Sequence, residues 1–416
     1  MLRSNPDIRR DFHAFGYAYM TVLELDRCYG GSAVDLEQAG RCAVQAASAM
    51  TAGDVGRAER GLSEGLEALE RENRKLQPTP AAFTDTLHGG GLYDDVGYFE
   101  FDWPQHPADL LRSHLNWVQQ RSYRFNIDFG AQSVQCMAER FPRLFDDLRA
   151  AQDEGMVEFV NGTINQPYPP FHSLESQIRQ FADGNAALEG VLGRPARIYA
   201  SQEFGFSPQL ASILAQQGYA GAVLRVQNMG DAPTLREERI LWAAPSQDAL
   251  EAVPSHPYKS EQRNDATYNN LHLKLFAHQQ TGLDFAVFSG LGDISYYRPF
   301  REELARVCHY APVFGGFQTW SQYFAEPRPG QLRRHCFTME DFDCRAAFME
   351  IEGDWSAHRP VTGGNNTACM RSLSTSHLFC AAEMLEASLA AQGVKTRNPS
   401  ADRWSWTALA VHQGHD

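Results

Sequence analysis

Short apolar runs alternate with longer stretches of helical periodicity between residues 123 and 310. The apolar runs are 123–129, 157–160, 198–200, 221–224 and 285–288, and the helical stretches are 141–152, 175–192, 208–217 and 299–310. Strands and helices that alternate in this way form parallel sheets, because each crossover helix returns the chain to the same end of the sheet. The pattern predicts an α/β fold and leaves a barrel and an open sheet as alternatives. In both, functional side chains gather at the carboxyl ends of the strands.

The segments on either side of this pattern have a helical character. Residues 35–76 are rich in Ala, Glu, Leu and Arg with apolar residues at helical spacing, which predicts a helical hairpin broken near 51–53. Prolines within 77–80 end the second helix, and residues 370–392 again have a helical pattern. We therefore predict three parts, which are a helical segment 1–82, an α/β domain 83–330 and the start of a helical domain 331–416.

Composition excludes several partners. A formal net charge of -14 opposes binding to nucleic acid and to anionic membrane surfaces. The sequence has neither an apolar run long enough to span a membrane nor a signal peptide, so we expect a cytoplasmic protein. The eight cysteines are scattered without a CxxC pair, which indicates reduced and mostly buried thiols.

Carboxylates and amides recur where the predicted strands end. The segments concerned are 93–98, 128–130, 161–168, 201–207 and 290–293. Acid and base chemistry on a glycosidic bond requires two carboxyl groups that face one cleft. Asp95, Glu203 and Asp293 are the best candidates for this pair. His88, which three glycines follow, has no role that the sequence assigns.

Aromatic side chains accompany these positions and are of the kind that stacks on sugar rings. Together with Gln166, they form the predicted substrate-binding set, which comprises Tyr93, Tyr98, Trp103, Tyr168, Phe206 and Tyr296. Each aromatic residue taken singly is better explained as part of a hydrophobic core, and only their joint arrangement favours a sugar site.

Seven short motifs, in order, resemble the N-terminal catalytic domain of glycoside hydrolase family 38, the α-mannosidase family. The matching segments are 93–98, 155–162, 172–184, 201–207, 290–293, 318–324 and 413–416. The resemblance implies a (β/α)7-type barrel followed by a helical domain, a retaining mechanism and a zinc ion. It also implies that Asp293 is the acid/base. Because the last motif falls at residues 413–416, we expect the helical domain to be truncated here.

The resemblance implies that zinc would be bound at positions 93, 95, 202 and 415, and two of these four depart from the family pattern. Asp95 and His415 match it, whereas Tyr93 stands in place of a His and Gln202 in place of an Asp. A neutral amide and a protonated phenol are poor zinc ligands. We therefore expect zinc, or another divalent metal, to be weakly held or absent.

Gln202 also occupies the position of the family's nucleophile, and an amide cannot form the usual ester with the sugar. Glu203 is the next residue and is the alternative nucleophile, because related family 57 barrels carry a Glu on the corresponding strand. Adjacent strand residues point to opposite faces, so this alternative requires the strand to end or bulge there. Glu203 and Asp293 would then form a retaining pair about 5 Å apart.

Three functional hypotheses remain open at the level of sequence. The first is a retaining glycosidase that acts on an α-linked sugar and resembles an α-mannosidase, with Asp293 and Glu203, or a rearranged Asp95, as its carboxylates. The second is a carbohydrate-binding pseudoenzyme with a degraded zinc site. The third is a deacetylase or transglycosylase of the same superfamily. The sugar, the linkage and the oligomeric state are not determined by the sequence.

Overall fold

The structure is a computed structural model, and it divides into two compact units that each combine distant parts of the sequence. The first unit comprises Met1–Thr86, Ser113–Phe125 and Tyr258–Thr319, and the second comprises Leu87–Arg112, Asn126–Pro257 and Trp320–Asp416. The residues described are 6–28, 33–76, 81–89, 105–120, 123–167, 169, 172–200, 206–224, 233–254, 286–293, 305–308, 316–328, 330–342, 366–394 and 405–410. The boundaries at 82 and 330 stay predictions.

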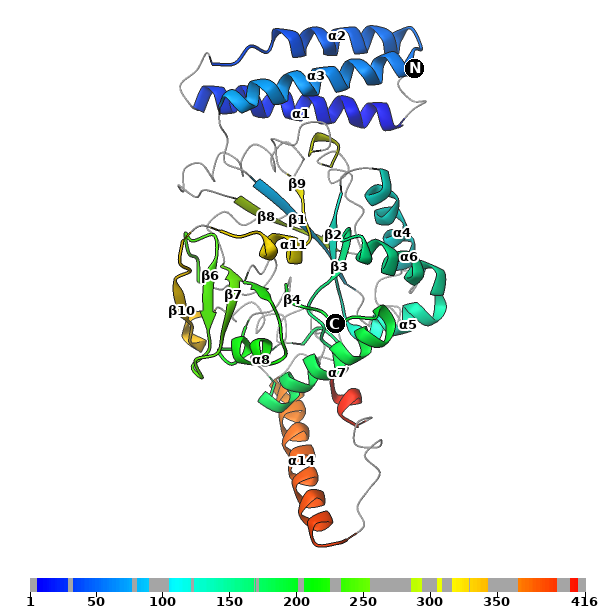
Figure 1. Cartoon of the computed structure of the whole chain (residues 1–416). Coiled ribbons are helices and arrows are strands. Elements are labelled where there is room, and N and C mark those ends of the chain that lie inside the picture. Colours follow the sequence, from blue (N-terminus) through cyan, green and yellow to red (C-terminus); the bar gives the residue numbers. More distant parts are fainter. Residues whose placement is uncertain are drawn as a thin grey trace. The chain divides into compact units, whose positions relative to one another are not determined.

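Three helices lie side by side in the first unit (Figure 1): α1 (Pro6–Cys28), α2 (Glu37–Thr51) and α3 (Val55–Lys75). The chain turns between α2 and α3 at Gly53, whose φ of 81° favours glycine, and the Asp54 side chain caps α3 by accepting from the Arg57 amide at 3.0 Å. Gly65 permits close packing, because a Cβ there would be 2.7 Å from the Phe15 ring. The predicted hairpin is confirmed, and α1 completes a three-helix bundle.

The first unit also contains parallel strands. In β1 (Ala81–Gly89), Ala82 and Phe83 pair in parallel with Gly316 and Phe317 of β9, and β8 (Ala286–Asp293) is a further neighbour of β1. A buried ion pair between Asp11 and Arg306 joins α1 to residues 305–308. Since β1 begins at Ala81, directly after the proline-containing segment, the change from helix to sheet falls where the sequence predicts it.

The second unit contains a five-stranded sheet in the order β10-β6-β7-β5-β4. Its strands are β4 (Ile198–Tyr199), β5 (Gly221–Val223), β6 (Ile240–Ala243), β7 (Ala249–Val253) and β10 (Arg334–Cys336). Neighbours in this sheet are parallel except for β6 and β7, which form an antiparallel hairpin that the sequence analysis did not predict. The loop between them turns at Gln247, whose φ is 78°.

Two further strands and several helices complete this unit. The strands β2 (Phe125–Phe129) and β3 (Val157–Phe159) are neighbours, and the first residue of β2 belongs to the first unit. The helices are α5 (Ala131–Arg140), α6 (Pro142–Asp153), α7 (Leu174–Leu192), α8 (Leu210–Gln216), α11 (Trp320–Ala325) and α14 (Asn366–Ala391), with the 3-10 helix η4 at Met339–Asp341. Helix α4 (Gln105–Gln120) is shared between the units. The predicted strands and helices are confirmed wherever the described residues cover them.

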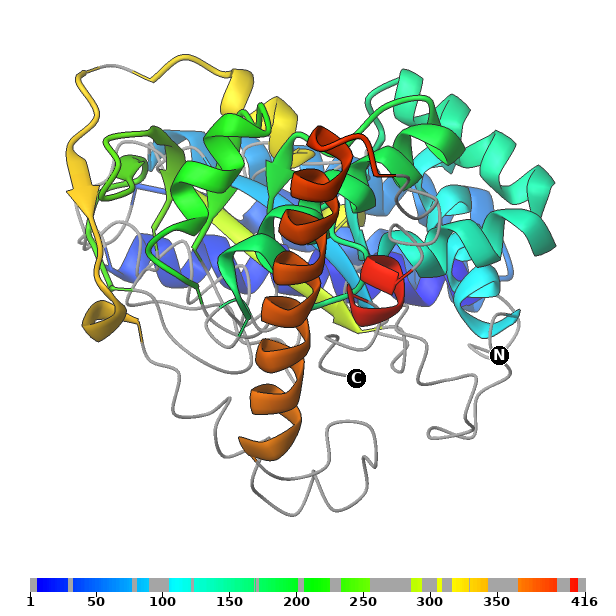
Figure 2. The ribbon, with the colours of Figure 1, turned by 90° about the horizontal axis from the view of Figure 1, so that it is seen from below.

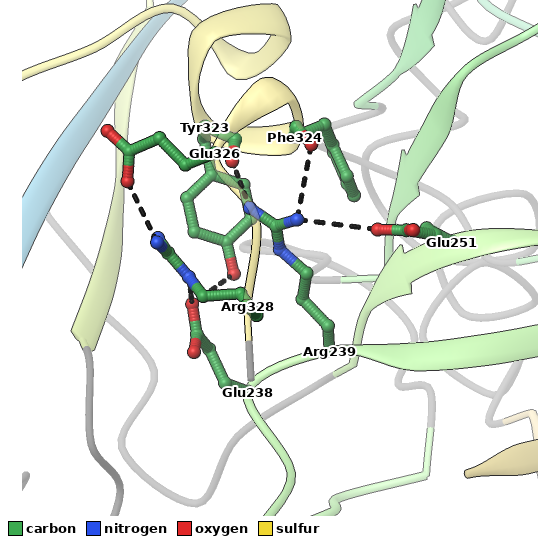
Figure 3. Close-up of polar contacts among 7 residues, drawn as sticks. All are labelled: Glu238, Arg239, Glu251, Tyr323, Phe324, Glu326 and Arg328. Atoms are coloured by element: carbon green, nitrogen blue, oxygen red, sulfur yellow. Dashed lines mark hydrogen bonds and ion pairs between the residues drawn. The ribbon is translucent and has the colours of Figure 1, made fainter. Parts of the chain in front are cut away.

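A buried arginine fastens α11 beside β6 (Figure 3). The Arg239 guanidinium donates to the carbonyl of Tyr323 and, at 3.2 Å, to that of Phe324, and it lies 4.2 Å from the centre of the Tyr323 ring. Arg328 pairs with Glu238 at 2.8 Å, and the Tyr323 hydroxyl donates to the same carboxylate at 2.9 Å. Tyr323 belongs to the motif at 318–324, so the structure gives that motif position a packing role.

The α/β class with parallel strands, preceded and followed by helices, is confirmed. The described strands form two sheets. The described cysteines are free thiols: Cys42 and Cys308 are buried, Cys136 and Cys380 are partly buried and Cys336 is exposed, so the prediction of mostly buried thiols holds only in part. Burial raises the pKa of the Cys308 thiol, which keeps it protonated. Within the described residues, no helix has both the length and the apolar character required to cross a membrane.

Candidate functional site

A buried polar cluster of the second unit lies near the carboxyl ends of three strands, and the end of β1 from Leu87 on belongs to this unit. His88 is the penultimate residue of β1, Asp128 is the penultimate residue of β2, and Asn161 follows β3 by two residues. The His88 Nδ1 atom is 3.0 Å from Oδ2 of Asp128, and their side chains are only 7% and 2% exposed. The Asn161 amide donates to the other oxygen of Asp128. Both carboxylate oxygens of Asp128 therefore have polar partners within the protein.

Gln166 completes the cluster. Its side-chain nitrogen donates to the Asp128 carbonyl at 3.1 Å and lies 3.4 Å from Nδ1 of His88. The carboxylate contact of His88 is the shorter one, so Nδ1 carries the proton and donates to Asp128. In the neutral imidazole, Nε2 is then the nitrogen that can accept a hydrogen bond.

The backbone at Asn161 is held in an uncommon conformation. Its φ is 67°, and its side-chain oxygen accepts from the Ala200 amide at 2.6 Å. The Tyr219 hydroxyl donates to the Asn161 carbonyl and accepts from the Asn185 amide at 2.9 Å. Burial raises the pKa of Tyr219, so its hydroxyl stays protonated and remains a donor. The Ala200 amide and the Tyr219 hydroxyl thus fix Asn161, whose side chain donates to Asp128.

Glycines of the motifs 155–162 and 172–184 shape the backbone beside this cluster. Gly155 and Gly162 have φ values of 70° and 73°, which residues with a Cβ adopt only under strain. Gly184 of α7 lies against the segment that follows Gly162: a Cβ there would be 2.6 Å from the Thr163 carbonyl carbon and 2.7 Å from the Ile164 nitrogen. Gly162 and Gly184 allow α7 to approach the strand end closely.

Three of the predicted site residues lie among the described residues. Asp293 is the last residue of β8, which is a strand end as predicted, and Gln166 belongs to the buried cluster. Phe206 is fully buried, with its ring centre 5.6 to 6.2 Å from those of Tyr199, Trp242 and Phe342. The others lie outside the described residues: Tyr93, Asp95, Tyr98, Trp103, Tyr168, Gln202, Glu203, Tyr296 and His415.

His88 is the residue that the sequence analysis named without assigning it a role. It is 5% exposed and contacts Asp128 and Gln166. A signal was present: Thr84, Thr86 and His88 alternate along one face of β1, and all three are buried polar residues. Polar side chains on a buried strand face mark a functional interior more strongly than the glycines that follow His88.

No three His, Cys, Asp or Glu side chains group as a metal site within the part of the chain that the structure describes. The cluster offers one histidine, one carboxylate and two amides, and Asp128 already accepts hydrogen bonds at both oxygens. The four positions that the family pattern assigns to zinc all lie outside the described residues.

The fold and the cluster define a mixed α/β protein with parallel strands and polar side chains gathered at strand ends, which is where enzymes of this class hold their sites. Residues 102–311, or 210 of the 416 residues, match the model of the family described as glycosyl hydrolases family 38 N-terminal domain. The chain belongs to this family. A comparison with curated proteins gave no match.

Solved structures to which parts of this chain are similar include an alpha-mannosidase, a 4-alpha-glucanotransferase and a putative polysaccharide deacetylase. An alpha-mannosidase from Enterococcus faecalis V583 has a TM-score of 0.48 at 11% identity, with 62% of this chain and 30% of that chain covered. A 4-alpha-glucanotransferase from Thermococcus litoralis has a TM-score of 0.47 at 13% identity, with 80% and 55% covered. A putative polysaccharide deacetylase from Mycobacterium smegmatis has a TM-score of 0.40 at 13% identity, with 61% and 96% covered. The chain thus spans 30% of the mannosidase and 55% of the glucanotransferase.

Proposed function

We propose that this protein is a retaining glycoside hydrolase that cleaves an α-linked sugar and has an α-mannosidase-like substrate. The observation that carries the proposal is the family match, because the matched residues 102–311 contain both Glu203 and Asp293. The position of Asp293 at the end of β8 supports it, since catalytic carboxylates of such folds follow strand ends.

Two carboxyl groups carry the proposed reaction. Asp293 donates a proton to the glycosidic oxygen as that bond breaks, and Glu203 attacks the anomeric carbon to form a glycosyl ester. Asp293, now a carboxylate, takes a proton from a water molecule, which displaces Glu203 and releases the sugar with retained configuration. The neutral Gln202 has no place in this sequence of steps other than hydrogen bonding to the sugar.

The zinc ion of the family pattern does not fit this donor set well. Tyr93 and Gln202 replace two charged or readily coordinating ligands, while Asp95 and His415 keep the other two. We propose that a divalent metal is weakly held or absent, and no step above depends on one.

The sugar itself would be held by aromatic faces and by one amide. The proposed substrate-binding residues are Tyr93, Tyr98, Trp103, Tyr168, Phe206 and Tyr296, with Gln166 as the polar member. Gln166 is the best supported of these, because it lies beside His88 and Asp128 in the buried cluster.

A carbohydrate-binding protein without turnover is the second candidate. The replacement of the family's nucleophile by Gln202 favours it, because loss of that carboxylate removes the usual covalent intermediate. Under this alternative the aromatic residues and Gln166 still bind sugar.

Hydrolysis of a panel of aryl α- and β-glycosides, measured with and without added zinc, tests the proposal. We expect turnover of an α-glycoside that is abolished by Asp293→Asn and Glu203→Gln and unaffected by zinc. The matched control is Asp147→Asn, which makes the same change at an exposed position on α6.

The outcomes separate the candidates. If the Asp293→Asn variant keeps its turnover, Asp293 is not the acid/base. If the Glu203→Gln variant keeps its turnover while the Asp293→Asn variant loses it, Glu203 is not the nucleophile. If no glycoside is hydrolysed but calorimetry detects sugar binding, the hydrolase proposal is wrong and the protein is a carbohydrate-binding protein.

A further inference from the structure

The buried face of α7 carries three uncharged amides, Gln177, Gln180 and Asn185, which are 6%, 0% and 9% exposed. A buried amide destabilises a protein unless its donor and its acceptor both find partners. Each of these three uses both ends of its side chain to hold a segment outside α7. The face therefore fixes other parts of the chain and does more than pack against them.

Gln180 joins two segments that are far apart in the sequence. Its oxygen accepts from the Asn165 backbone amide at 3.3 Å, and its nitrogen donates to the Ala410 carbonyl at 2.7 Å. The Asn165 side-chain oxygen in turn accepts from the Gln166 backbone amide at 2.9 Å, and the Gln166 side chain contacts His88. One amide thus links the segment 405–410 to the polar cluster.

Gln177 holds two further segments one helical turn earlier. Its oxygen accepts from the Ser207 hydroxyl at 2.8 Å, and its nitrogen donates to the carbonyls of Pro169 and His172 at 2.8 and 3.0 Å. Gln177 therefore holds Ser207, the last residue of the motif 201–207, against the segment that precedes α7.

The segment 405–410 has a second anchor on the same helix. Arg179 pairs with Glu383 of α14 at 2.9 Å and lies 4.3 Å from the centre of the Trp406 ring, and the Trp406 indole donates to Glu383 at 2.7 Å. Figure 2 shows the helix formed by 405–410, drawn in red, beside α14. Trp406 and Ala410 of this segment are thus held by Arg179 and Gln180 of α7.

We propose that Gln177 and Gln180 are positioning residues that align residues 163–166, 206–207 and 405–410 beside the polar cluster for the reaction. This inference rests on the proposed glycosidase function. Neither glutamine is assigned a contact with the sugar, so each acts through the segments that it holds.

The first variant to make is Gln180→Met, which keeps the length of the side chain and removes both hydrogen bonds without burying a charge. Misplacement of reacting groups by about 1 Å lowers turnover on the order of 100-fold, so we expect kcat for an aryl α-mannoside to fall by about that factor with KM nearly unchanged. The matched control is Gln322→Met, because Gln322 donates to the Gly155 carbonyl at 2.8 Å before β3 begins, away from the strand ends. That control should keep its kcat.

The second variant, Gln180→Glu, gives a signature that loss of packing would not. A protonated carboxyl group has one donor and one acceptor, so it can replace both bonds of the amide, whereas the ionised form repels the Ala410 carbonyl. Burial raises the pKa of a carboxyl group at this position. We expect the kcat of this variant, relative to that of the unaltered protein, to recover as the pH falls from neutral to mildly acidic values.

Hydrogen exchange provides a readout that does not need activity. Exchange of the backbone amides of 163–166 and 405–410 should rise in Gln180→Met and stay unchanged in Gln322→Met. If the unaltered protein hydrolyses no glycoside, the proposed function fails, while this exchange result still decides whether Gln180 fixes both segments. Unchanged exchange, or unchanged kcat in Gln180→Met, overturns the positioning role. If Gln180→Met fails to fold, Gln177→Met tests the same role through exchange at 206–207.

Discussion

Two glycines of α7 should respond in opposite directions to the same substitution by alanine. Gly190 is exposed and no atom lies within 4 Å of the position that its Cβ would take, so Gly190→Ala should stabilise the protein by about 0.5–1 kcal/mol through helix propensity. Gly184 is buried, and its Cβ would come within 3 Å of three backbone atoms of Gly162, Thr163 and Ile164. These atoms cannot rotate away as a side chain could.

The magnitude at Gly184 follows from the same contacts. Overpacking costs about 1–3 kcal/mol, and the upper value applies because the neighbours are backbone. After the gain in helix propensity of about 1 kcal/mol is subtracted, Gly184→Ala should be about 2 kcal/mol less stable than the unaltered protein. The two variants should thus differ by about 2.5–3 kcal/mol.

Urea unfolding followed by tryptophan fluorescence measures both variants. The midpoint should rise for Gly190→Ala and fall for Gly184→Ala, with similar slopes. A midpoint for Gly184→Ala at or above that of the unaltered protein would refute the close approach of α7 to residues 162–164. It would also remove the packing reason for the glycine in the motif 172–184.

Two further variants test buried polar pairs. Asp11→Ala removes the carboxylate that pairs with the buried Arg306, so it should lower the free energy of unfolding by about 3–5 kcal/mol. The double variant Asp11→Leu/Arg306→Met removes both charges and should lose much less stability. Equal losses for the two variants in urea unfolding would contradict the buried pair. Asp128→Asn keeps the shape of the side chain but cannot accept from both His88 and Asn161, so it should destabilise the protein by about 1–3 kcal/mol and reduce glycoside turnover. Unchanged turnover in a folded Asp128→Asn variant would show that the polar cluster does not contribute to the reaction.

Much of the fold could be predicted from local pattern. The helices at 142–153, 174–192 and 210–216 and the strands at 125–129 and 157–159 coincide with the predicted stretches, because periodicity and apolar runs are properties of neighbouring residues. The hairpin of β6 and β7 was missed because its stability depends on pairing with β5 and β10.

The candidate site could likewise be predicted only in part from the sequence. Sequence alone indicated the family and the strand-end position of Asp293, because these depend on residue identity and order. The loss of zinc ligands at Tyr93 and Gln202 stays a prediction. Only the tertiary structure decided that His88 pairs with Asp128. It also decided that Gln180 bonds both to Asn165 and to Ala410, which lies 230 residues further along the chain. Such contacts depend on distances between segments, and no local pattern in the chain encodes those distances.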